Sequence, residues 1–155
     1  MLFFLSKLSH SYRFFSTFKE KKMSQRDLFL KELRGNTIGE VSHESSIDER
    51  FQNEVLRPIL KLQNDIFIAA FIDYLIKNKI DFNSFSVDKK MNVIDTILQK
   101  DIKFRNTLKG MIIGLFTSYD FSIYTKNETS LSKRMFTMLI ERLKSQMQLF
   151  EFKTI

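Results

Sequence analysis

The chain has 155 residues, with no Cys, no Trp, one Pro and four Gly, and 25 Lys and Arg stand against 18 Asp and Glu. This length predicts one domain, and an apolar content of 43% is enough to form a core. The lack of Cys excludes disulfides, thiolate metal sites and cysteine nucleophiles, and it fits a cytoplasmic protein. The shortage of Pro and Gly argues against the many tight turns of a β-sandwich or barrel.

Residues 1–22 hold much of the basic excess: five basic residues and one Glu give +4 of the total +7, which leaves +3 for residues 23–155. Their Phe- and Ser-rich composition fits a targeting peptide, although Ser6 and Lys7 interrupt the apolar run that a secretory signal needs. A further interpretation starts translation at Met23, because the residues just before it require purine-rich codons like those of a bacterial ribosome-binding site. We favour the start at Met23 and treat residues 1–22 as an N-terminal extension. The mild charge of the remainder makes a nucleic-acid partner unlikely.

Helical periodicity predicts the first elements of residues 23–155. Ser24 has the character of an N-cap for a short helix that ends at Gly35. Residues 35–46 are rich in Gly and Ser and predict a flexible linker. A capping box at residues 46–49 then opens a long helical pattern that reaches about Lys77. Pro58 within it predicts a kink or the first turn of a new helix.

The segment Ile59–Lys77 is expected to be the central helix of a bundle, because apolar residues occur on all of its sides from Ile66 to Ile76. Asp73 and the short length exclude a membrane span here. The pattern then predicts a loop at residues 78–86, helices beginning near Ser86 and Asp101, a short helix at 118–126 and a last helix at 130–150. No segment alternates as a strand does. The sequence therefore predicts an all-α, single-domain bundle of about five to six helices.

Three runs resemble a family of short, all-helical bacterial proteins that is sometimes labelled "glyoxalase". They are residues 56–61 (LRPILK), 100–106 (KDIKFRN) and 109–114 (KGMIIG). The resemblance extends from Met23 to about Glu151 and implies a helical fold. It transfers no functional residues to this chain.

The sequence offers few residues for catalysis or metal binding. Glu40 and His43 have the Glu-x-x-His spacing of helical di-metal sites, but residues 23–155 contain no second His. We interpret His43 as a solvated loop residue and predict no catalytic residue, metal or cofactor.

Two features of residues 100–114 have alternative interpretations. Gly110 and Gly114 share a helix face and predict close packing, either within the monomer or at the seam of a homodimer. Lys100, Lys103, Arg105 and Lys109 form a basic run that is expected to be solvated, with Arg105 able to pair with Asp101.

Polar residues interrupt the apolar stripes of two predicted helices, and they supply the candidate binding residues. Arg142 and Gln146 interrupt the last stripe, whereas Asp73 and Gln63 interrupt the central one. Because an unpaired buried charge is costly, we expect Arg142 to reach Asp73, or alternatively Asp101. The cluster is either a structural ion pair or an anion-binding pocket in which Arg57 and Arg142 are the donors.

These patterns predict a small non-enzymatic helical protein that acts by contacts with another protein or with a second copy of itself. The alternatives are the glyoxalase-labelled enzyme and an anion-binding protein with a pocket around Arg142. Nucleic-acid binding is the least favoured class, because the aromatic residues lie at core spacing.

Overall fold

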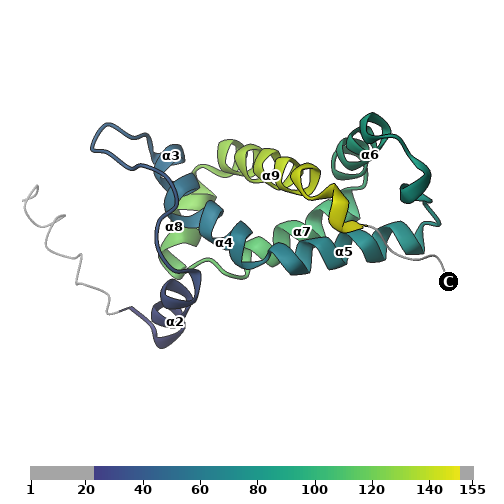
Figure 1. Ribbon diagram of the computed structural model, residues 1–155. Coiled ribbons are helices and arrows are strands. Elements are labelled where there is room, and N and C mark those ends of the chain that lie inside the picture. Colours follow the sequence, from purple (N-terminus) through teal and green to yellow (C-terminus); the bar gives the residue numbers. More distant parts are fainter. Residues whose placement is uncertain (1–22, 151–155) are drawn as a thin grey trace, which may run out of the picture.

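A computed structural model describes residues 23–150, and Figure 1 shows that they fold as an elongated stack of helices. The N-terminal extension, residues 1–22, lies outside the described residues. Within residues 23–150 the elements are α2 (Gln25–Arg34), α3 (Ile47–Phe51), the π-helix η1 (Gln52–Leu56), α4 (Arg57–Leu62), α5 (Asn64–Lys77), the 3-10 helix η2 (Phe82–Ser84), α6 (Val87–Lys100), α7 (Ile102–Ile113), α8 (Ser118–Lys126), α9 (Glu128–Ser145) and the 3-10 helix η3 (Met147–Phe150). There is no strand among them, which confirms the all-α class. With α3, η1 and α4 counted as one helix the described chain has seven helices, where we predicted five to six.

The predicted N-caps are confirmed by hydrogen bonds at four helix starts. Ser24 accepts from the backbone N–H of Asp27 at 3.1 Å, and Ser46 from that of Glu49 at 3.2 Å. Ser86 and Asp101 accept from the N–H groups of Lys89 and Phe104 in the same way. A side chain that satisfies a free N–H in the first turn fixes where a helix begins, which explains why these starts could be located in the sequence.

Pro58 lies in the first turn of α4 and explains the π-helix before it. Its ring nitrogen cannot donate to the carbonyl four residues back, and the ring would clash with that carbonyl. The backbone N–H of Arg57 instead bonds the carbonyl of Gln52, five residues back. The wider turn keeps α3, η1 and α4 in one continuous helical path, as π-bulges do inside α-helices.

The predicted central helix, Ile59–Lys77, was wrong in two respects. Gln63 leaves the helical conformation, with φ −89° and ψ 8°, and divides the segment into α4 and α5. The segment is also not buried on all sides, because Ile66 and Ile76 are 49% and 55% exposed. The other helices cover only the face of α5 that carries Phe67, Phe71 and Leu75.

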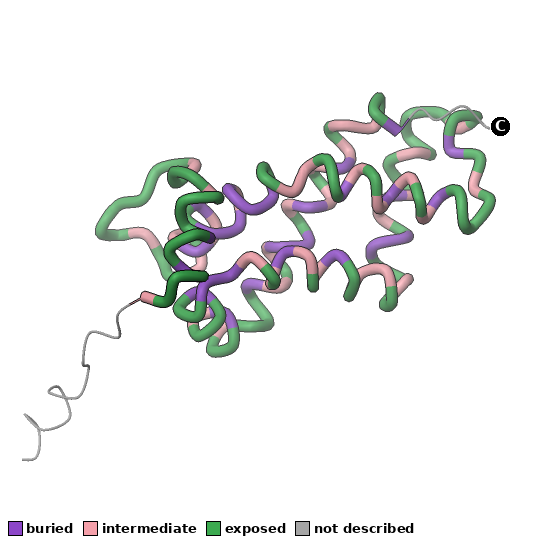
Figure 2. The backbone as a smooth tube through the Cα atoms, turned by 90° about the horizontal axis from the view of Figure 1, so that it is seen from below, coloured by how far each residue is buried: buried purple, intermediate pink, exposed green. Residues whose placement is uncertain are grey.

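The core is a single cluster, and Figure 2 shows buried stretches on the tube from one end of the described fold to the other. One end is aromatic: the ring centroids of Phe71 and Phe150 are 5.0 Å apart, and that of Phe82 is 6.0 Å from Phe71. Phe82 is buried, so the segment after α5 packs against the other helices. At the other end the rings of Phe51 and Phe116 meet edge to face at 5.4 Å. Such pairs add about 0.5–1.5 kcal/mol each to the burial of their area.

The first helix, α2, is held to the body by polar contacts. Arg34 donates to Asp120 at 2.7 Å, and the two side chains are only 5% and 6% exposed. Asp120 also accepts from the backbone N–H of Thr117 and completes a capping box at the start of α8. Asp27 accepts from the backbone N–H of Ser118. Both ends of the short helix α2 are therefore hydrogen-bonded to the first turn of α8.

A second polar junction joins α5 to the start of α7. Asp101 accepts from the backbone N–H of Phe104 and from the Tyr74 hydroxyl, both at 2.9 Å. These donors hold the pKa of the Asp101 carboxyl below its ordinary value. Burial, together with the hydrogen bond to Asp101, raises the pKa of Tyr74.

None of the helices in residues 23–150 combines the length and the apolar character that crossing a bilayer requires. This finding agrees with the exclusion of a membrane span at the predicted central helix.

Removal of the guanidinium at Arg34 should leave the buried carboxylate of Asp120 without a cationic partner. We expect Arg34→Met to lower the free energy of unfolding by roughly 3 kcal/mol, because Asp120 keeps its charge but loses its cation. Urea unfolding followed by circular dichroism measures the change. Lys31→Met is the matched control, since Lys31 is an exposed residue of the same helix and its loss should cost less than about 0.5 kcal/mol. Equal effects of the two substitutions would contradict a stabilising pair.

Acid should weaken the junction at Asp101. The pKa of this carboxyl is lowered by folding, so its contribution is complete above its unfolded value of about 3.9 and is lost as the pH falls through the folded value. We therefore expect the stability difference between the wild type and Asp101→Asn to shrink below about pH 4. Urea titrations across a pH series measure it. A difference that stays constant with pH would show that ionisation of Asp101 plays no part.

Candidate functional site

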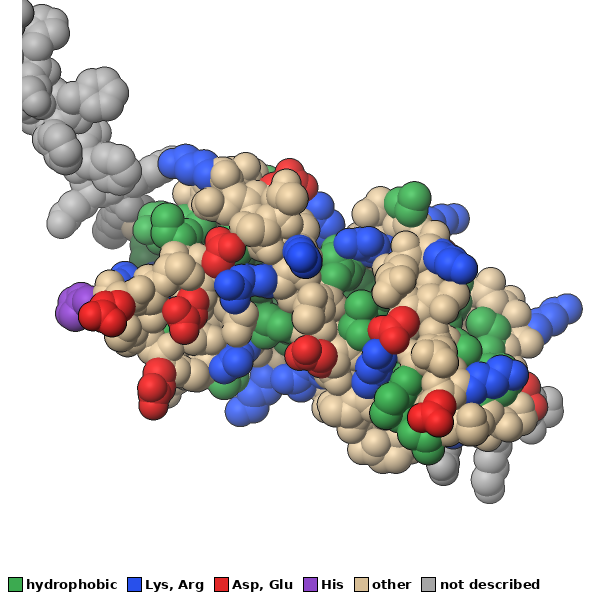
Figure 3. Space-filling view, turned by 90° about the horizontal axis from the view of Figure 1, so that it is seen from above, with side chains coloured by type: hydrophobic (Ala, Val, Ile, Leu, Met, Phe, Trp, Pro, Cys, Tyr) green, Lys and Arg blue, Asp and Glu red, His purple; other side chains and the backbone are tan. Residues whose placement is uncertain are grey.

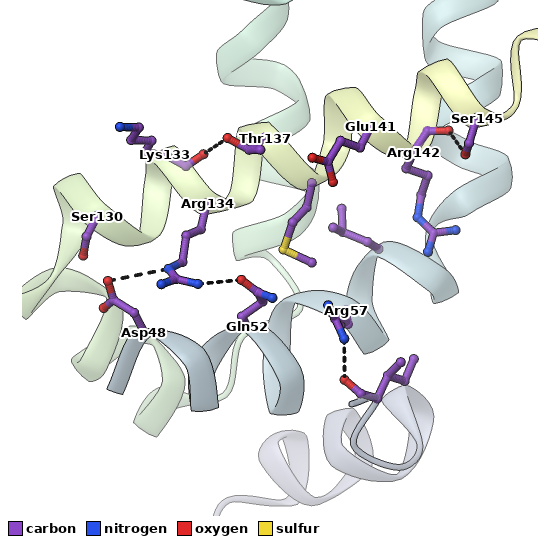
Figure 4. Close-up of a pocket in the computed structure, with 13 residues that line it drawn as sticks. Asp48, Gln52, Arg57, Ser130, Lys133, Arg134, Thr137, Glu141, Arg142 and Ser145 are labelled. Carbon is purple, nitrogen blue, oxygen red and sulfur yellow. Dashed lines mark hydrogen bonds and ion pairs between the residues drawn. The ribbon is translucent and has the colours of Figure 1, made fainter. Parts of the chain in front are cut away.

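A groove of about 910 Å³ lies between α9 and the helical path formed by α3, η1 and α4. Figure 4 shows polar side chains from both walls facing across it. The lining residues are Ile38, Asp48, Gln52, Arg57, Leu60, Ser130, Lys133, Arg134, Thr137, Met138, Glu141, Arg142 and Ser145. Four of them are cationic and two are carboxylates, so the groove has a net charge of +2. We call it the α4–α9 groove.

Two of the predicted binding residues line this groove: Arg142 extends from the end of α9 toward the opposite wall, and the bonded nitrogen of Arg57, on α4, faces the carbonyl of Ile38 (Figure 4). The two residues are 85 positions apart in the sequence. The interpretation that named both as donors to one anion stays a prediction.

Arg142 does not make the ion pair that the sequence predicted. Its Nη1 donates to the amide oxygen of Asn64 at 3.2 Å. Asp73 points into solvent and pairs with Lys77 one turn later at 2.7 Å, with 59% of its side chain exposed. The carboxylate of Asp101, the alternative partner, accepts a hydrogen bond from the Tyr74 hydroxyl instead. The prediction failed because it assumed an unbroken helix through Gln63, which would have turned Asp73 inward.

Arg57 also has a neutral partner. Its Nη1 donates to the carbonyl oxygen of Ile38 at 3.5 Å, the outer limit of a hydrogen bond. Neither Arg57 nor Arg142 has a carboxylate partner among residues 23–150. Each guanidinium has five N–H donors, so most donors of both residues are left for water or a ligand.

A third arginine, Arg134, was not identified from the sequence. It donates to Gln52 at 2.7 Å, and its Nε lies 3.7 Å from a carboxylate oxygen of Asp48 (Figure 4). These contacts tie α9 to α3 and η1 along the floor of the groove. The sequence could have indicated Arg134, because it lies eight residues before Arg142 and therefore on the same side of α9.

The predicted linker, residues 35–46, contains no helix and is hydrogen-bonded to the wall of the groove. Asn53 donates to the carbonyl of Glu40 at 2.8 Å, and the backbone N–H of Ile38 donates to the carbonyl of Asn53 at 3.0 Å. Gly39 permits this approach: it has φ +104°, and a Cβ at this position would lie 2.7 Å from Nη1 of Arg57. Glycine is therefore required both by the backbone and by the position of Arg57.

The remaining candidate residues, Gln63 and Gln146, do not line the groove. Gln63 forms the break between α4 and α5, and Gln146 ends α9. The side-chain oxygen of Gln146 is buried and has no hydrogen-bond partner in the described part of the chain. The proposed polar cluster around Arg142 therefore separates into unconnected parts.

Gly110, within α7, does not pack against the rest of the monomer as one interpretation expected. A Cβ at Gly110 would have nothing within 4 Å, so that position faces open space. The alternative, a dimer seam, stays a prediction. Arg105 also differs from expectation, since its guanidinium lies over the ring of Phe136, 4.1 Å from the centroid, and does not pair with Asp101.

No group of three or more His, Asp or Glu side chains within residues 23–150 is arranged to hold a metal ion. His43 lies exposed in the segment before α3, as we expected of a loop residue.

Comparisons of the chain with models of protein families, with curated proteins and with solved structures find no match. The resemblance to the glyoxalase-labelled family therefore stays a prediction, and the site must be interpreted from its own chemistry.

A methyl group at residue 39 should disturb both the segment of residues 35–46 and the α4–α9 groove. We expect Gly39→Ala to destabilise the fold by about 1–3 kcal/mol, because alanine is strained at this φ and its Cβ displaces Arg57. Thermal unfolding measures the loss. Gly110→Ala is the control, since its Cβ meets open space and alanine favours a helix. A Gly39→Ala protein as stable as the wild type would contradict the close approach.

Proposed function

We propose that this protein acts without catalysis, by binding an acidic segment of a partner protein in the α4–α9 groove. One observation carries the proposal: Arg57 and Arg142, from different parts of the chain, line the same groove and are held only by neutral oxygens. A guanidinium that lacks an internal carboxylate can make charge-assisted hydrogen bonds to an incoming one.

The shape of the groove suits an extended segment better than a small molecule. It is open along its length between two helices, whereas small-ligand sites are enclosed and largely apolar. The hydroxyl groups of Ser130, Thr137 and Ser145 donate to backbone carbonyls of the same helical segment, so their oxygens add acceptors along the α9 wall. A peptide backbone and its carboxylates could therefore both be satisfied in the groove.

The charge pattern favours a peptide over a nucleic acid. Asp48 and Glu141 lie within the groove, and Figure 3, which views the molecule from the α9 side, shows carboxylates interspersed among the Lys and Arg side chains. A nucleic-acid backbone carries a negative charge at every nucleotide and would meet these acids. A peptide can place its acidic residues only where the arginines are.

Loss of either arginine should weaken peptide binding. We expect Arg142→Gln and Arg57→Gln each to raise the Kd for a fluorescent peptide with one Glu-Glu pair by about tenfold, since a hydrogen bond to a charged group contributes roughly 1.5 kcal/mol. Fluorescence anisotropy at low salt measures Kd.

Lys31→Gln provides the matched control for this measurement. It removes the same charge from α2, which lies on the side of the molecule opposite α9 (Figure 1), and it should leave Kd unchanged. Equal weakening by all three substitutions would mean that the peptide senses net charge alone, and the groove would then not be the site.

A further inference from the structure

A second hollow lies on the other side of α9, where this helix meets the end of α6 and the start of α7. It has a volume of about 450 Å³ and is lined by Leu98, Gln99, Arg105, Glu128, Thr129, Ser132, Lys133, Phe136, Thr137 and Ile140. We call it the α7–α9 groove. Lys133 and Thr137 line both grooves, so the two hollows are separated only by the outer ridge of α9.

Arg105 makes the α7–α9 groove a site for a carboxylate. Its guanidinium stacks on the buried ring of Phe136, and it has no hydrogen bond or ion pair to any other side chain within residues 23–150. Stacking fixes the plane of the guanidinium and leaves its N–H edge free, which is the geometry that binds a carboxylate with two parallel hydrogen bonds. The one acid of this groove, Glu128, is already paired with Lys109 at 2.9 Å.

Three parallel rows of α9 connect the two grooves. Arg134, Met138 and Arg142 face the α4–α9 groove, and Ser132, Phe136 and Ile140 face the α7–α9 groove. Lys133, Thr137 and Glu141 are exposed on the ridge between them. Residues four apart lie on one side of a helix, so each row is a continuous strip.

We infer that the partner segment crosses α9 and places one acidic group at Arg142 and a second at Arg105, with Lys133 beneath the crossing. This inference rests on the proposed function and adds the second contact. A helix with its side chains is about 10–12 Å wide, and an extended chain rises about 3.3 Å per residue. Arg142 also lies six positions along α9 from Phe136, over which Arg105 lies, so the crossing advances about 9 Å along the helix, and the two acidic groups of the partner are separated by about four to five residues.

The test compares two labelled peptides of equal length. One carries a Glu-Glu pair at each end of a linker of about six Gly and Ser residues, and the other has one pair replaced by Gln-Gln. Because the second contact is made within the complex, the two-pair peptide should bind the wild type about tenfold or more tightly than the one-pair peptide. In Arg105→Gln this advantage should fall to about twofold, because either of the two equivalent Glu-Glu pairs can still bind the α4–α9 groove. The one-pair peptide should keep its affinity for that groove.

Lys133→Gln is a second variant that does not depend on the contact between Arg105 and Phe136, because Lys133 is exposed and its side chain makes no hydrogen bond or ion pair within residues 23–150. It should also reduce the advantage of the two-pair peptide. Circular dichroism and the thermal midpoint of each variant show whether the fold is kept.

Three outcomes would overturn the inference. An advantage that Arg105→Gln leaves unchanged would remove the second site, while the dependence of the one-pair peptide on Arg142 would keep the proposed function. Failure of both peptides to bind the wild type would remove the proposed function as well. A single-stranded oligothymidine that binds more tightly than the two-pair peptide and displaces it would assign these grooves to nucleic acid.

Discussion

Burial of one row of apolar side chains on α9 sets the arrangement of the whole surface. Leu131, Met135, Leu139 and Leu143 recur every four residues and are at most 1% exposed. Once this row enters the core, the rotation of α9 about its axis is fixed, and every other row has a determined direction. The rows beside it face the two grooves, and the opposite row forms the ridge. The positions of Arg134, Arg142 and Lys133 therefore follow from hydrophobic packing and not from contacts among the polar groups themselves.

Proline at residue 58 has a comparable influence on the opposite wall. The π-turn that it imposes shifts the residues before it relative to those after it, and it brings Gln52 and Arg57 to the same groove. Asn53 and Arg57 also bind the segment around Gly39, so the groove wall and the segment are coupled. A ligand that takes the guanidinium of Arg57 competes with a single long hydrogen bond to Ile38. The energetic cost of that exchange is small, which suits a binding surface.

The buried ion pair between Arg34 and Asp120 plays a different part from the groove arginines. It is short, enclosed and supported by the capping box at Thr117, so neither side chain is exposed to an incoming ligand. Arg57, Arg105 and Arg142 are only partly buried and have neutral or aromatic partners. An enclosed guanidinium beside a carboxylate stabilises the fold. A partly exposed guanidinium without a carboxylate partner can instead bind a ligand.

The sequence by itself determined the helices and most of their starts, because a capping side chain such as Ser86 or Asp101 acts on N–H groups only two or three residues away. It also indicated Arg142, since a charge on an apolar stripe needs an explanation wherever the stripe packs, and it named Arg57 as a second donor to the same anion. It did not determine that Asp73 faces solvent or that Arg105 stacks on Phe136. Those outcomes depend on the break at Gln63 and on which helices meet, and both are decided by contacts between residues far apart in the chain. The two grooves were also decided by tertiary structure, because a groove exists only when two helices from different parts of the sequence lie side by side.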